Sequence, residues 1–160
     1  MATVMLHKDF ERINKENEMN NIVTDVISIR KLVDGYWGVE NLHNIVPARS
    51  MLKLARSYGY EEAPVMHLEI FFDLGEFEEL PEEAAMLAYY MTCLFSRDFQ
   101  CVYALHEDKG RLRVHILVNM ICMHDGHIMY MNEMVAAGIF QCAFELLKKY
   151  SIETMQSVVV

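Results

Sequence analysis

The chain has 160 residues, of which 53% are hydrophobic and 23% are charged, so it is long enough and apolar enough to form one domain with a core. This composition excludes an intrinsically disordered chain, and no stretch approaches the roughly 20 apolar residues of a membrane span. The formal net charge of −9 argues against a protein that covers nucleic acid broadly, because affinity for the phosphate backbone comes mainly from Lys and Arg.

The 4 cysteines show no CxxC spacing and lie in apolar surroundings. This pattern is typical of reduced core thiols rather than of disulfides or zinc ligands. The N-terminal residues lack the layout of a signal peptide. We therefore expect a cytoplasmic protein with no membrane partner.

The N-terminal quarter of the chain predicts one strand and one helix. Residues 3–6 form a short apolar run and predict a strand, whereas the polar residues 8–21 predict an exposed loop. Apolar residues then recur at near-helical spacing, which predicts a short helix over residues 22–30. Residues 33–39 contain Gly35 and Gly38 and predict a turn-rich connection.

A second helix and a strand follow. Pro47 suits the first turn of the helix, Asn44 is a candidate cap, and Gly59 ends the apolar pattern. After Pro64, residues 65–72 predict a strand. One face of that strand carries His67, Glu69 and Phe71.

The second half of the chain predicts, in order, a helix that begins at Pro81, strands over residues 101–106, 111–123 and 128–131, and a helix over residues 133–149. Asp125 and Gly126 lie between apolar flanks and predict the last hairpin turn. The tail, residues 150–160, is short and apolar. Strands joined by turns indicate antiparallel pairing, so we expect a single α+β domain over residues 1–160, with helices over one face of an antiparallel sheet.

The most informative stretch is residues 102–119, which reads as two strands joined by a polar turn. In its second strand, Arg111, Arg113 and His115 alternate with aliphatic residues, so the three basic side chains share one face. His106, at the end of the first strand, can reach the same face. Such a row of His and Arg over an apolar back indicates the floor of a site.

This stretch resembles the central motif of plasmid mobilisation relaxases, members of the HUH endonuclease superfamily. That motif reads roughly H-x-D, a short turn, H-x-H-x-H, then three residues and an Asn. His106 and Asp108 fit its first half, and His115 and Asn119 fit its end. The resemblance implies a relaxase-like α+β fold, with the three metal-binding histidines of the family at His106, position 113 and His115.

A relaxase nicks one DNA strand by attack of a Tyr hydroxyl on a phosphodiester, and its histidines hold a divalent metal that polarises the phosphate. The resemblance therefore implies that His106 and His115 are metal ligands and that Asp108 and Asn119 are catalytic residues, with Asp108 orienting a ligand. Arg111 and Arg113 stand where the family has histidines, and we expect them to contact DNA phosphates or, for Arg113, to pair with Asp108.

Two departures from the family pattern predict impaired nicking. A guanidinium is always protonated and has no lone pair for a metal, so Arg113 makes the expected divalent metal site weak or absent. The family carries its nucleophilic Tyr in the first helix, where the matching residues here are Asp25 and Val26. No Tyr occurs before Tyr36, which lies beyond that helix.

Two hypotheses about function follow. The first is a relaxase-like domain of DNA mobilisation, catalytically impaired, that binds single-stranded DNA weakly. The second is a non-catalytic binding or regulatory module that partners another protein or forms a homodimer, with an apolar surface around Val158, Val159 and Val160. Without the resemblance, His106 and His115 would read as strand histidines that only satisfy hydrogen bonds, and His67 reads as structural.

Overall fold

The computed structural model describes residues 2–7, 11–28, 32–42, 45–72, 81–108, 111–150 and 154–159, with residues 11, 34, 35, 81, 108 and 154–159 described by their backbone alone. The strands are β1 (Ala2–Leu6), β2 (Glu11–Ile13), β3 (Leu32–Glu40), β4 (Ala63–Phe72), β5 (Gln100–Asp108), β6 (Arg111–Asn119) and β7 (Thr154–Val159). The helices are α1 (Glu16–Val26), α2 (Pro47–Ser57), α3 (Pro81–Ser96) and α4 (Glu133–Lys149).

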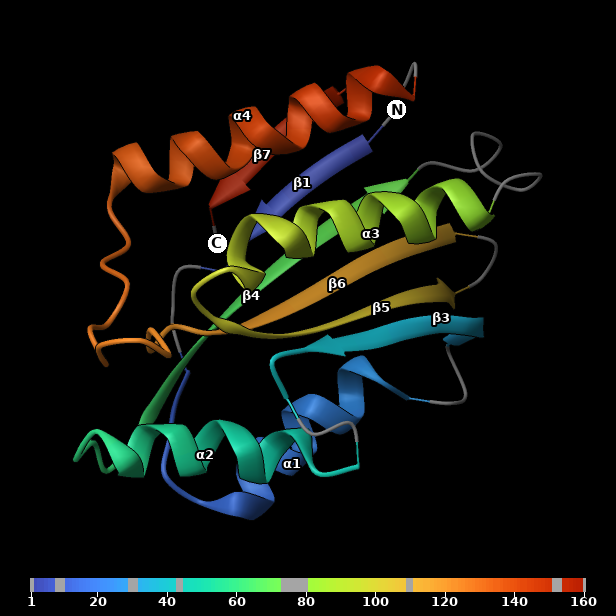
Figure 1. Ribbon diagram of the computed structural model, residues 1–160. Helices are drawn as coiled ribbons and strands as arrows, with labels where there is room; N and C mark the ends of the chain where they lie inside the picture. The colour runs from blue at the N-terminus through green and yellow to red at the C-terminus, as the bar shows by residue number, and fades with distance from the viewer. Residues whose placement is uncertain are drawn as a thin grey trace.

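The described strands form one sheet with the order β3-β5-β6-β4-β1-β7, and β2 pairs with β4 beyond the end of β1 (Figure 1). All neighbouring pairs are antiparallel except β1 and β7, which run parallel. The α+β class with an antiparallel sheet is therefore confirmed. The two strands of the central motif, β5 and β6, lie in the interior of the sheet beside β4.

Helices cover both faces of the sheet, so the expectation of helices over one face is wrong. Helices α3 and α4 pack on one face, and α1 and α2 pack on the other (Figure 1). The interior strands explain this arrangement because they are apolar on both sides. In β6, Val114 and Ile116 are buried under α3 and α4, whereas Leu117 is buried under α1 and α2.

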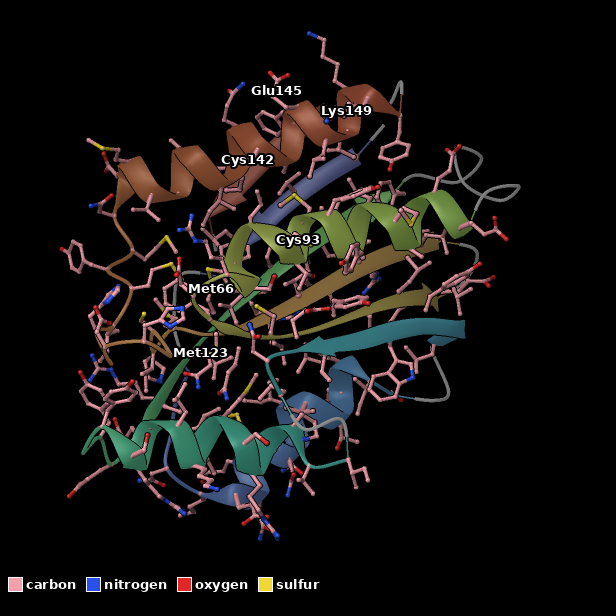
Figure 2. All side chains as sticks on the ribbon, viewed as in Figure 1. Met66, Cys93, Met123, Cys142, Glu145 and Lys149 are labelled. Carbon is pink, nitrogen blue, oxygen red and sulfur yellow. The ribbon has the colours of Figure 1, made fainter. Side chains whose placement is uncertain are left out.

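The helices predicted in the middle and at the end of the chain form as expected. In α4, the side chain of Asn132 accepts a hydrogen bond from the Val135 N–H at 2.9 Å, and two lysines occupy the last turn, where the helix dipole favours cations. The outer face of α4 carries the exposed Cys142, Glu145 and Lys149 (Figure 2). Met66 of β4 is buried in the core between the sheet and α3 (Figure 2).

The N-terminal region differs from the sequence prediction. The polar segment predicted as a loop contains β2 and most of α1, which begins at Glu16 and ends at Val26. Helix α1 buries Met19, Val23 and Val26, one residue in each turn, so three apolar positions are enough to hold a polar helix on the sheet. The predicted cap Asn44 lies outside the described residues.

The segment predicted as a turn-rich connection is strand β3, paired with β5. Gly38 serves a close approach rather than a turn, because a Cβ at this position would collide with the ring of Tyr103. The predicted tail contains β7, which pairs with β1. The predicted strand over residues 111–123 ends at Asn119, and residues 128–131 contribute only an isolated bridge, Ile121 to Ile128.

Candidate functional site

The side chains of the central motif point to the face of the sheet that α1 and α2 cover. Strand alternation places His106 of β5 and His115 of β6 on this face, and the register sets His106 opposite Arg113. On the other side of β6, Glu69 of β4 lies opposite His115 and Phe71 lies opposite Arg113. Polar residues of three neighbouring strands therefore meet under helix α1.

These residues line a cleft of about 320 Å³ whose described lining is Asp25, Val26, His67, Glu69, His106, Arg113 and His115. The expected convergence of His106, Arg113 and His115 in one cavity is found. The ring centroids of His106 and His115 are 4.3 Å apart, and both residues are buried. Helix α1 forms one wall of this cleft through Asp25 and Val26.

Glu69 is the centre of the polar contacts in the cleft. Its Oε2 lies 2.8 Å from Nε2 of His7, and its Oε1 lies 3.0 Å from Nδ1 of His115. Burial raises the pKa of the Glu69 carboxyl, but hydrogen bonds from His115 and His7 and the charge of nearby histidines outweigh burial, so the pKa falls to about 2. At neutral pH the cleft therefore contains a buried carboxylate.

His67 completes a row of imidazoles across three strands. Its ring stacks on His7 with centroids 4.9 Å apart and on His115 with centroids 5.3 Å apart. Its Nε2 lies 3.1 Å from Nδ1 of His115 and 4.0 Å from Oε1 of Glu69. Burial lowers the pKa of His67 to about 4, and neighbouring histidines add to this effect, whereas Glu69 opposes it. His67 is therefore a neutral imidazole at pH 7.

His106 contacts the C-terminal end of α1. Its Nε2 forms a hydrogen bond with the backbone carbonyl of Val26, and because a carbonyl can only accept, this nitrogen carries the proton. Val26 occupies the position where the resemblance implies the nucleophilic Tyr. Asp25, which precedes Val26 in α1, is exposed at the rim of the cleft.

The three family positions do not provide a three-histidine metal site in this chain. The Nε2 of His106 donates its proton to Val26, and Arg113 contributes a permanent cation whose guanidinium lies 5.0 Å from the Phe71 ring centroid. Imidazoles therefore occupy two of the three family positions, His106 and His115. A different group of described side chains, His7, His67 and Glu69, places one ligand atom each within 4.8 Å of the others.

The remaining predicted site residues lie elsewhere or are not described. Asn119 is fully buried at the far end of β6 and is not part of the cleft lining. Its side-chain amide donates to the Gln100 side chain at 3.0 Å and to the Met51 carbonyl at 3.3 Å. Arg111 is exposed, and the side chain of Asp108 lies outside the described residues.

The nearest tyrosine in the sequence, Tyr36, cannot replace the missing one. It packs on the core between the sheet and α3 and α4, which is the opposite face from the cleft.

Two histidines near the cleft were not predicted as site residues: His7 was not singled out from the sequence, and His67 was assigned a structural role. Pairing of β1 with β4 brings His7 beside His67, since the His7 N–H donates to the His67 carbonyl at 3.0 Å. A lone histidine at a strand end carries no periodic signal that could have revealed this.

The fold and the cleft define an α+β domain in which strand histidines converge under the first helix. A family profile described as "Relaxase: MobA/VirD2-like, nuclease domain" matches residues 35–152, well over half of the chain. The chain therefore belongs to this relaxase family. Helix α1 precedes the matched residues. A search of curated proteins finds no matching relative, and among the described helices none is long and apolar enough to cross a membrane.

Proposed function

We propose that this chain is a relaxase-like domain that no longer nicks DNA and that acts in the cytoplasm during plasmid mobilisation. One observation carries the proposal. Among the described residues that line the cleft, none has a hydroxyl or thiol that could attack a phosphodiester. The α1 residue that contacts His106 is Val26, and it does so through its backbone carbonyl.

The electrostatics of the cleft support the loss of nicking. Displacement at a phosphodiester builds up negative charge, which relaxases offset with a divalent metal. Here Arg113 supplies a cation in the cleft but cannot polarise a phosphate oxygen as a metal does. Under this proposal, His106 and His115 hold a divalent metal weakly or not at all, and Asp108 and Asn119 have no catalytic role left to perform.

Weak binding of single-stranded DNA is part of the same proposal. Arg111 is exposed on β6, and Arg113 lies two residues further along the same face. Two phosphate contacts give weak and strongly salt-dependent affinity. The carboxylates of Asp25 and Glu69 line the same cleft and repel the phosphate backbone. We therefore expect binding that disappears at physiological salt.

An adduct assay tests this function directly. The protein is incubated with labelled single-stranded oligonucleotides and Mg²⁺ or Mn²⁺, and a denaturing gel is searched for a covalent protein–DNA adduct. Fluorescence anisotropy at low and physiological salt measures binding in parallel. We expect no adduct and binding at low salt only. An adduct in the natural chain overturns the proposal, and loss of that adduct in Tyr36→Phe would identify the nucleophile.

A second candidate function, a module that binds a protein partner or a second copy, is favoured by the outer face of α3. Large apolar side chains are exposed on this helix, namely Met86, Tyr89, Tyr90 and Leu94. Light scattering across a concentration series tests self-association. A dimer that dissociates in Tyr90→Glu but not in the α4 surface variant Glu145→Gln would support this function, whereas a monomer at all concentrations excludes the homodimer.

A further inference from the structure

We propose that His7, His67 and Glu69 bind one divalent transition-metal ion of the zinc class, at a site beside the three family positions rather than on them. This inference goes beyond the proposed function, because it concerns a ligand set that the family motif does not contain. It depends on the geometry of three residues from β4 and the end of β1, and it holds whether or not the domain touches DNA.

The distances suit a small ion after a modest rearrangement. Nε2 of His7 lies 2.8 Å from Glu69 Oε2, Nε2 of His67 lies 4.0 Å from Glu69 Oε1, and one ligand atom from each residue lies within 4.8 Å of the others. Tetrahedral zinc with bonds of about 2.0–2.1 Å separates its ligand atoms by about 3.3 Å. Side-chain rotations that move the ligand atoms by about an ångström therefore bring His7, His67 and Glu69 onto one ion.

The cluster contains more hydrogen-bond acceptors than donors. Nδ1 of His115 lies 3.0 Å from Glu69 Oε1 and 3.1 Å from His67 Nε2, yet one N–H cannot serve two acceptors well. Nε2 of His115 is buried and has no hydrogen-bond partner among the residues that the structure describes. If the His115 proton sits on Nδ1, Nε2 is an unsatisfied acceptor, and if it sits on Nε2, two lone pairs face each other at Glu69. A cation bound by His67 and Glu69 takes up the lone pair of His67, so the N–H at Nδ1 of His115 is left with one acceptor, Glu69 Oε1.

His115 then becomes the residue that orients a ligand. With its proton on Nδ1, His115 donates to Glu69 Oε1 and holds the carboxylate in place. Metal ligands are commonly oriented in this way by a hydrogen bond from a residue that does not itself touch the metal. The lone pair of His67 is left for the metal. His115 itself is buried, at 8% exposure, so it fits a supporting role better than a role at an exposed ion.

The site is open enough for an ion and a water ligand to enter. The His7 side chain is 35% exposed and that of His67 is 28% exposed, whereas Glu69 is 11% exposed. The His7 and His67 rings are nearly parallel, with an interplanar angle of 12°, so one ring must tilt to share an ion. His7 is the one that can move, because it follows the last residue of β1 and its side chain is half-exposed.

The donor set indicates which metals bind. Two imidazole nitrogens and one carboxylate, with water in the open position, suit Zn²⁺, Co²⁺ or Ni²⁺. Mg²⁺ prefers oxygen ligands and keeps several waters, so it competes poorly at this site.

Cobalt titration of the full chain, stripped of metal with a chelator, provides the test. Tetrahedral Co²⁺ gives visible absorption bands when it binds, and Zn²⁺ displaces it. Calorimetry with Zn²⁺ measures affinity and stoichiometry. We expect one ion per chain, and we expect His7→Ala to weaken binding by about tenfold or more because one of three protein ligands is lost. Glu69→Gln should weaken it further, and circular dichroism verifies that each variant is folded.

Two matched controls separate this site from its competitors. His106→Ala removes a family position, and His127→Ala removes a ligand from the other candidate group, Cys122, Asp125 and His127. The first variant, verified to be folded, should still bind one Co²⁺ ion, and the second should bind Co²⁺ with the affinity of the natural chain. If His106→Ala loses Co²⁺ binding while His7→Ala keeps it, the proposal is overturned in favour of the family positions. Absence of any cobalt spectrum in the natural chain would overturn it as well.

Discussion

The imidazole of His106 donates a hydrogen bond to the backbone carbonyl of Val26, which joins strand β5 to the last residue of helix α1. The last carbonyls of a helix have no partner within the helix, and this bond provides one for the carbonyl of Val26. The histidine that the relaxase motif assigns to metal binding thus holds a helix in this chain.

We predict that His106→Ala destabilises the fold by about 1–3 kcal/mol, because the carbonyl of Val26 loses its donor in a buried position. Urea unfolding followed by circular dichroism measures the effect. His124→Ala is the matched control: its imidazole is 65% exposed, and we expect a change within about 0.5 kcal/mol. Equal stability of His106→Ala and the natural chain would show that the bond contributes nothing to folding.

Arg113→His should strengthen zinc binding at the family positions. The substitution removes a fixed cation from the cleft and places a third imidazole opposite His106 in the register. We expect a gain of about tenfold or more by calorimetry in a His7→Ala background, which disables the neighbouring candidate site. Arg111→His adds an imidazole at the exposed start of β6 and should leave the affinity unchanged. An equal gain in both variants would contradict the assignment of position 113.

Stability of the metal-free protein should decrease with acidification. The folded-state pKa of His67 is about 4, below the usual 6.5, mainly because the imidazole is buried. As the pH falls through this interval, the unfolded chain binds a proton that folded His67 does not, so the free energy of unfolding decreases. The full shift corresponds to about 3 kcal/mol.

Urea unfolding in the presence of a chelator, from neutral pH to about pH 4.5, measures this dependence. In His67→Gln the decrease should be smaller, because the titrating group is gone. His127→Gln is the control, since that imidazole is 59% exposed and its loss should leave the profile unchanged. The same pH profile in His67→Gln and the natural chain would contradict the assignment to His67.

Substitution of two glycines by alanine tests the packing of the edge strand β3 against β5. Gly38→Ala places a methyl group against the Tyr103 ring and should destabilise the protein by about 1–3 kcal/mol. Gly138→Ala, on the exposed side of α4, meets no atom of the described residues within 4 Å. There the substitution should stabilise by about 0.5–1 kcal/mol, because Ala loses less conformational freedom in a helix than Gly. Thermal unfolding compares the two, and destabilisation by both would refute the packing argument.

The sequence by itself determined the elements whose signals are local. Helix α2 begins at Pro47 as expected, and α4 matches its predicted bounds, because proline, capping and apolar periodicity act within a few residues. The shared face of Arg113 and His115 was also predictable, since side chains alternate along any strand. The place of His106 at the end of the neighbouring strand predicted that it could reach the same face, and the family motif added its expected role as a metal ligand.

Only the tertiary structure decided which residues gather around Glu69. His7 and Glu69 are 62 positions apart, and they meet because β1 pairs with β4 in one particular register. Likewise, the C-terminal strand β7 forms by pairing with the N-terminal strand β1. Such pairings depend on packing over the whole sheet, and a single histidine at a strand end has no period that reports its partner. The site's metal-ligand geometry therefore follows from strand register rather than from any motif in the sequence.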